Sequence, residues 1–170
     1  MSSPTIDPET IVLGTLMQAT PAEARPKLTR LDYRDFTNPP ARLTFDLMAA
    51  LVTGDVPSLD PATLLGFAER VGAFTDTNHA NLLTRWVFDA FTVAVPLVAL
   101  DFHITRLIET GYRRRVAELG TALVQAAARP VLADLDAFTA RLTTELAAHR
   151  ARIDDQAPAL RVAQDTGRAA

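Results

Sequence analysis

Apolar residues recur at helical spacing along most of this chain. In residues 7–18, Val12 and Leu16 fall on one side of a helix, and Asp7 followed by Pro8 is a typical helix start. The same kind of pattern predicts further helical segments over residues 22–31, 39–54 and 60–72, and another that begins at Thr77 or Asn78. These segments predict a compact helical bundle over residues 1–96.

The second half of the chain has a longer pattern. From Pro96 to Arg129 no proline interrupts it, which predicts one helix roughly 50 Å long at 1.5 Å per residue. The apolar positions change phase near Thr110 and Gly111, so the two ends of this helix are expected to face different neighbours. Pro130 is expected to end the helix.

A last helix is expected to begin at Asp134 or Asp136 and to continue to Ile153, which completes an antiparallel helical hairpin. The predicted fold is therefore all-α, with a compact helical bundle followed by a long antiparallel helical hairpin. The expected organisation is a bundle over residues 1–96, an assembly region over 97–153 and a flexible tail over 154–170.

Two helices alone have too few partners to bury their apolar positions. An open apolar side of this length favours self-association over folding back onto the bundle, although both remain open at this point. The residues expected to associate are Tyr112, Val116, Leu119, Leu123, Phe138, Leu142, Leu146 and His149.

Five further residues are candidates for binding a partner. Arg113, Arg114 and Arg115 could contact an acidic protein surface or a nucleic-acid backbone, because arginine forms paired hydrogen bonds with carboxylates and phosphates. The alternative is a solvated helix face, since three consecutive residues point in different directions. Phe88 lies off the apolar stripe of its helix, and with Phe91 it is a candidate interface anchor.

Composition restricts the chemistry that this chain offers. It has 170 residues, no cysteine, a net charge of −3 and three scattered histidines, which predicts no metal site, no cofactor and no catalytic group. Its net charge also makes direct DNA contact weak at best. No run of about 18 apolar residues is present, so the chain is expected to be cytoplasmic and not to enter a membrane.

Several segments together resemble the N-terminal domain of bacterial replicative helicases, the DnaB family. They occur in the family's order and cover residues 8–152. The segments are Glu9–Leu16, Asp35-Phe36 with Arg42–Met48, Gly54–Pro57 with Asp60–Leu64, and Asp101–Arg106 with Arg113–Arg115.

This resemblance implies dimers formed through the hairpin, which in the family assemble as a trimer of dimers and contact primase and loader proteins. The glycine-rich loop with lysine that holds phosphates in the helicase motor is lacking, so no ATPase activity is expected. The predicted function is a non-catalytic replication accessory protein that docks a helicase, a primase or a loader. The alternatives are a DNA-binding or regulatory helical protein that reuses the fold, and a relic of a truncated helicase.

Overall fold

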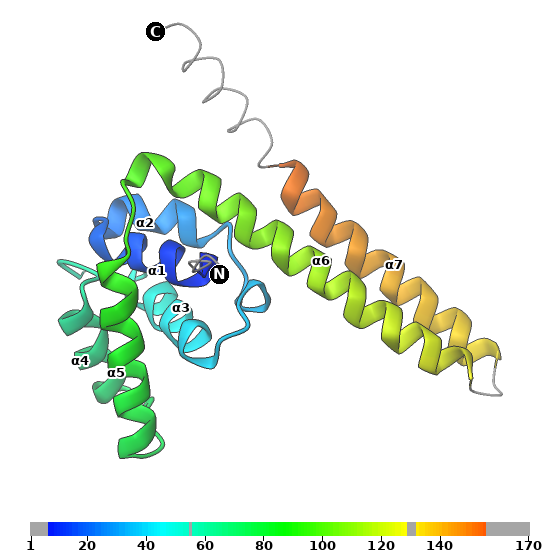
Figure 1. Ribbon diagram of the computed structural model, residues 1–170, viewed down its shortest axis with the longest axis horizontal. Coiled ribbons are helices and arrows are strands. Elements are labelled where there is room, and N and C mark those ends of the chain that lie inside the picture. The colour runs from blue at the N-terminus through cyan, green and yellow to red at the C-terminus, as the bar shows by residue number, and fades with distance from the viewer. Residues whose placement is uncertain (1–6, 55, 129–131, 156–170) are drawn as a thin grey trace, which may run out of the picture. The chain divides into compact units, whose positions relative to one another are not determined.

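The computed structural model describes residues 7–54, 56–128 and 132–155, and all regular structure within them is helical (Figure 1). The predicted all-α class is therefore confirmed. Contacts between residues divide the chain into two units, Met1–Leu107 and Ile108–Ala170. The predictions that concern Asp55, the helix end at Pro130 and the tail over 156–170 lie outside the described residues.

The bundle helices begin where proline and capping residues place their starts. Their bounds are α1 Pro8–Gln18, α2 Pro21–Leu28, α3 Pro39–Leu51, α4 Pro61–Arg70 and α5 Thr77–Thr92, with 3-10 turns η1 Tyr33–Asp35 and η2 Leu97–Ala99. Asp7 and Asp60 accept hydrogen bonds from backbone N–H groups in the first turns of α1 and α4. Asp76 caps α5 by accepting from the His79 N–H, so the expected cap at Thr77 or Asn78 is wrong by one or two residues.

Helix α1 lies at the centre of the bundle. Every residue from Ile11 to Met17 is buried, and Val12, Leu13 and Leu16 have no exposed surface. A helix that is buried on all sides needs neighbours on all sides. Both α3 and α5 pack against α1.

The contact between α1 and α5 depends on Gly14. A Cβ atom at this position would lie 2.0 Å from the backbone oxygen of Ala90 and 2.7 Å from its carbonyl carbon. The two helix backbones therefore touch where only glycine fits. The close approach of another helix explains why α1 keeps a residue that costs about 1 kcal/mol relative to alanine.

Polar groups on α1 hold the chain segments around it. The buried carboxylate of Glu9 accepts hydrogen bonds from the N–H and hydroxyl of Thr37, each at 2.5 Å, and from the Asn38 N–H at 3.0 Å. Asn38 directly precedes α3. Glu9 therefore fixes the start of α3 against α1, and its buried charge is compensated by three donors.

The first turns of α6 (Leu100–Ala127) belong to the bundle. Leu100, Ile104 and Leu107 are buried. The bundle unit consequently extends to Leu107, whereas the expected boundary was residue 96, because the long helix begins as a core element.

An ion pair joins α2 to the start of α6. The Lys27 ammonium lies 2.7 Å from an oxygen of Asp101, and the guanidinium of Arg30 contacts the other oxygen. Partial burial raises the pKa of Asp101, but the hydrogen bonds from Lys27 and Arg30 outweigh it and hold that pKa below its ordinary value.

The second unit contains the rest of α6 and α7 (Leu132–Asp154), which run antiparallel and side by side (Figure 1). This arrangement is the predicted hairpin. Helix α7 includes Asp154, so the helix extends one residue into the segment expected to be a tail.

Replacing Gly14 with alanine is expected to destabilise the bundle by about 1–3 kcal/mol, because the new methyl group meets the backbone of Ala90 and forces α1 and α5 apart. Thermal unfolding followed by circular dichroism should show a lower Tm.

The matched control is Gly66→Ala in α4, where the structure places no atom of its described residues within 4 Å of the added Cβ. This change should stabilise the protein by about 0.5–1 kcal/mol. Equal effects of the two substitutions would contradict the role assigned to Gly14.

Candidate assembly interface

Apolar residues that recur three and four positions apart line the contact between α6 and α7. We call this contact the seam. On α7, Leu135, Phe138 and Leu142 are half-buried. On α6, Leu119 is only 6% exposed, and alanines follow it at the next seam positions. This spacing is that of two antiparallel helices packed along one stripe each.

His149 and Tyr112 close the end of the seam that lies away from the hairpin turn. Their rings meet edge to face with centroids 5.3 Å apart. The His149 Nε2 lies 3.3 Å from the backbone oxygen of Ile108 and donates to it. Both residues were predicted to mediate self-association, and the structure places them in contact with each other within one chain.

Arg115 links the two helices of the hairpin. Its guanidinium donates to both carboxylate oxygens of Glu145 on α7, at 2.6 and 3.1 Å, and to Glu118 on its own helix at 3.0 Å. The hydrogen bonds with Glu145, and then those with Glu118, raise the pKa of Arg115. Arg113 is exposed and Arg114 is half-buried, so the structure does not bring the arginine triplet together as one binding site.

One side of α6, next to the seam, carries an apolar surface. We call it the apolar flank, and its residues are Val116, Ala117, Gly120, Leu123, Val124 and Ala127. Val116 is 40% exposed and Val124 is 74% exposed. The sequence pattern had assigned Val116 and Leu119 to one stripe, but Leu119 packs in the seam while Val116 lies on the flank.

Threonines on α7 extend this uncharged side. By helical spacing, Thr139 and Thr143 lie on the opposite side of α7 from Arg141 and Glu145. Each hydroxyl donates to the carbonyl four residues earlier, at 2.9 and 3.0 Å. These hydroxyls are therefore satisfied within the helix, and their methyl groups remain available for apolar contact.

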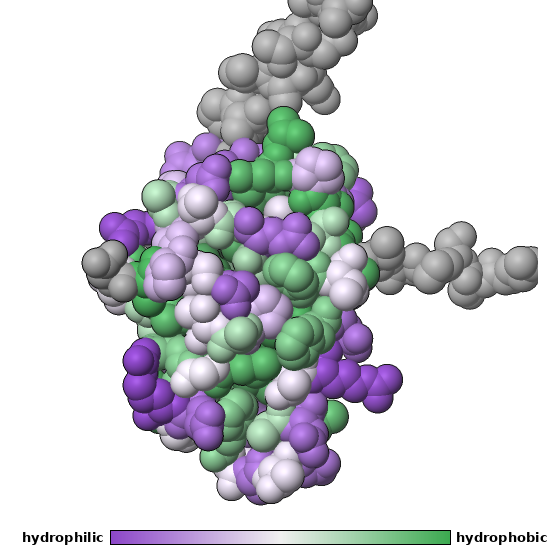
Figure 2. All heavy atoms as spheres, turned by 90° about the vertical axis from the view of Figure 1, so that its left-hand side faces the viewer, coloured by the Kyte–Doolittle hydropathy of each residue, from purple (hydrophilic) through white to green (hydrophobic). Residues whose placement is uncertain are grey.

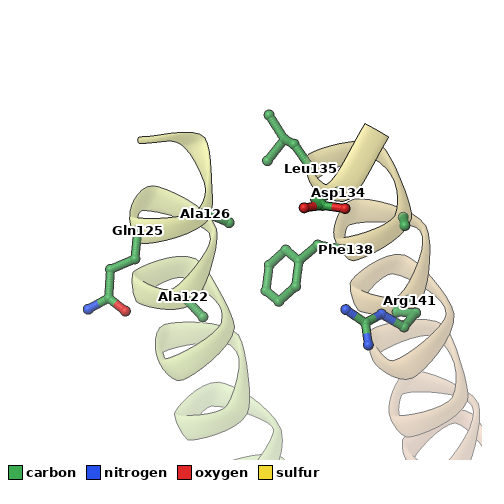
Figure 3. Close-up of a pocket in the computed structure, with 8 residues that line it drawn as sticks. Ala122, Gln125, Ala126, Asp134, Leu135, Phe138 and Arg141 are labelled. Carbon is green, nitrogen blue, oxygen red and sulfur yellow. The ribbon is translucent and has the colours of Figure 1, made fainter. Parts of the chain in front are cut away.

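The hairpin also has a pocket of about 290 Å³ near its turn, on the side that carries Arg141. Figure 3 shows Phe138 pointing from α7 toward Ala122 and Ala126 of α6. The Arg141 guanidinium lies 5.9 Å from the centre of the Phe138 ring. The pocket results from small residues on α6 opposite large ones on α7.

A second candidate surface lies on the bundle. Phe88 on α5 is 50% exposed and Phe91 is half-buried, while the backbone oxygen of Phe91 accepts from the Gln18 side chain at 2.9 Å. In Figure 2, apolar side chains reach the surface between polar ones on the side of the bundle that carries α4 and α5. Leu82, another apolar residue of α5, is 57% exposed.

Neither a metal site nor a single membrane-spanning helix is found in the part of the chain that the structure describes. No three histidine or acidic side chains there are grouped so that they could hold a metal ion. No single described helix is long and apolar enough to cross a membrane. Helix α5 and residues Leu97–Ala127 reach that length and apolarity only as a pair, which is bent by 100°.

Comparison with known proteins gives a likeness in fold. No protein-family model matches the chain, and no curated protein matches it either. Among solved structures, the crystal structure of the N-terminal domain of DnaB helicase from Mycobacterium tuberculosis is similar, with a TM-score of 0.63 and 19% identity. The match covers 86% of this chain and 97% of that chain. The fold implied by the sequence resemblance is thereby confirmed.

Replacing Arg115 with alanine is expected to loosen α7 from α6 by about 1 kcal/mol, because the partly exposed ion pair with Glu145 is lost. Hydrogen exchange of the α7 amides should become faster. Arg113→Ala, a change of the same size at an exposed position two residues away, should leave the exchange unchanged. Faster exchange in both variants would indicate that helix charge, and not the contact with Glu145, stabilises the hairpin.

Proposed function

We propose that this chain is a non-catalytic accessory protein of DNA replication. It associates with itself through the hairpin and docks a replicative helicase, a primase or a helicase loader as part of a primosome in the cytoplasm. The likeness in fold to the N-terminal domain of DnaB helicase supports the connection with a helicase. The apolar flank of the hairpin is the observation that carries the proposal of assembly.

The flank favours association because it is continuous and uncharged. From Val116 to Ala127, the residues on this side of α6 are all apolar, and the exposure of Val124 leaves most of its side chain in water. Burial of such a surface gains about 25 cal/mol for each Å² of apolar area. A second copy offers a surface of the same kind, which makes a homodimer the simplest assembly.

Docking of a second protein is assigned to the bundle and to two arginines, Arg113 and Arg114, near the start of the hairpin unit. Phe88 and Phe91 supply aromatic surface, which is enriched among residues that dominate binding energies. Arg113 and Arg114 supply positive charge for an acidic partner.

DNA binding is the less favoured function. The net charge is −3, and the Arg115 guanidinium is occupied by Glu118 and Glu145. A nucleic-acid site needs several cations free to neutralise phosphates. Contact with DNA is therefore expected to be weak and secondary to protein docking.

The purified protein is expected to have the mass of a dimer, or of a larger even-numbered assembly, in light scattering at micromolar concentration. Val124→Asp should dissociate it, because a charge on the flank would be buried in the assembly. The control is Gln125→Asp, which places the same charge on the adjacent residue beside the pocket, on another side of α6. A monomeric wild-type protein with an intact helical spectrum would exclude the proposed assembly.

Binding to the purified helicase, primase and loader of the organism that encodes this chain tests the docking role. Biolayer interferometry should detect at least one of them, and Phe88→Ala should weaken that binding about tenfold, as expected for an exposed aromatic anchor. Arg85→Ala, at an exposed position on the same helix, should have little effect. Absence of binding to all three proteins would argue against a replication role.

A further inference from the structure

A groove lies in the bundle unit where the ends of α2 and α3 meet. Its volume is about 450 Å³, and it is lined by Arg25, Leu28, Thr29, Ala49, Val52 and Thr53. Concave sites of about 300–1,000 Å³ with mostly apolar walls are typical of small-molecule binding. The groove uses none of the residues assigned above to self-association or to protein docking.

The floor of the groove is apolar. Leu28 of α2 is 4% exposed and Val52 at the end of α3 is 5% exposed, so both are core residues that reach the groove with a small part of their surface. Ala49 is half-buried beside them. Its single methyl group leaves open the space between the two helices that a longer apolar side chain would fill.

The threonines that line the groove have no hydrogen left for a polar ligand. The Thr29 hydroxyl donates to the Pro26 carbonyl at 3.0 Å, and the Thr53 hydroxyl donates to the Ala50 carbonyl at 2.6 Å. A hydroxyl group has a single hydrogen to donate. Among the described residues that line the groove, Arg25 therefore supplies the side-chain donors that a ligand can use.

Arg25 is oriented by the end of α3. Its Nη2 donates to the backbone oxygen of Val52, the residue that caps this helix. This bond uses only one of the several N–H groups that a guanidinium carries. Because the side chain is already oriented, it loses less conformational freedom when it binds a ligand.

The charges around the groove favour a negatively charged ligand. Arg25, Lys27 and Arg30 lie at the end of α2, whereas Glu23 lies in its first turn and Asp101 is shared by Lys27 and Arg30. Carbonyl groups at the end of a helix repel anions. The three carbonyls described above already accept hydrogen bonds from side chains, which reduces that repulsion.

We propose that this groove binds a small organic acid, with its carboxylate paired to Arg25 and its aliphatic or aromatic part against Leu28, Ala49 and Val52. A guanidinium and a carboxylate form two parallel hydrogen bonds. A phosphate group fits less well, because it has more oxygens than a single guanidinium can satisfy. This ligand site is independent of the assembly and docking proposed above.

Nuclear magnetic resonance titration of the full chain tests the site, with octanoate as the probe and octanamide as its uncharged counterpart. Octanoate should bind saturably and shift the amide signals of residues 25–29 and 49–53, and octanamide should bind at least tenfold more weakly. Arg25→Gln should weaken octanoate binding about tenfold and leave octanamide binding unchanged, because only the charged contact is lost.

The matched control is Arg42→Gln in α3. The Arg42 Nε also donates to a backbone oxygen, that of Phe36, at 2.8 Å, but Arg42 does not line the groove. This variant should bind octanoate with the affinity of the wild-type protein. Octanoate binding that Arg25→Gln leaves unchanged, or that both substitutions weaken equally, would overturn the role of Arg25.

Ala49→Leu tests the apolar part of the site. The longer side chain should fill the groove and abolish the saturable shifts caused by both probes, while the circular dichroism spectrum remains helical. Equal affinities for octanoate and octanamide, octanoate shifts confined to the hairpin, or no binding at millimolar concentration would each overturn the proposal. Tighter binding in this groove of an acetylated tetrapeptide that ends in a leucine carboxylate would also overturn it, in favour of the end of a partner chain.

Discussion

The bundle depends on the backbone contact between α1 and α5 at Gly14 and Ala90. Because the two helices touch there, two polar side chains that follow Gly14 in α1 reach the end of α5 and the residues just after it. The Thr15 hydroxyl accepts from the Val95 N–H at 3.0 Å, and the Gln18 amide donates to the Phe91 oxygen. The end of α5 is thereby fixed, and with it the positions of Phe88 and Phe91 on the bundle surface.

In the hairpin, α6 contacts α7 through two of its sides, one apolar and one charged. The seam of α6 uses Leu119 and alanines against α7, and its charged side is joined to α7 by Arg115 and Glu145. These contacts leave the apolar flank of α6 exposed among the described residues of the second unit. The division between a satisfied polar side and an unsatisfied apolar side is what makes assembly the preferred explanation of this element.

Much of the architecture was predictable from local signals. Proline after a capping residue placed the starts of α1 and α4, and the shift of apolar phase near Gly111 lies close to the division after Leu107. The start of α5 was harder to predict, because Asp76, Thr77 and Asn78 are all residue types that commonly cap helices. The geometry of the backbone selected Asp76.

The candidate site could be predicted only in part, because a heptad stripe does not reveal which of two neighbours each residue meets. Tyr112 and Leu119 face the second helix of the same hairpin, while Val116 and Val124 remain exposed on α6. Sequence reasoning had not included Val124 or Gly120, although the four apolar neighbours of Gly120 were a usable signal. A glycine whose local cost is offset within the chain, as at Gly14, reflects internal packing. At Gly120, no atom of the described residues beyond its own helix backbone lies within 4 Å of an added Cβ, so packing within the hairpin does not account for that glycine.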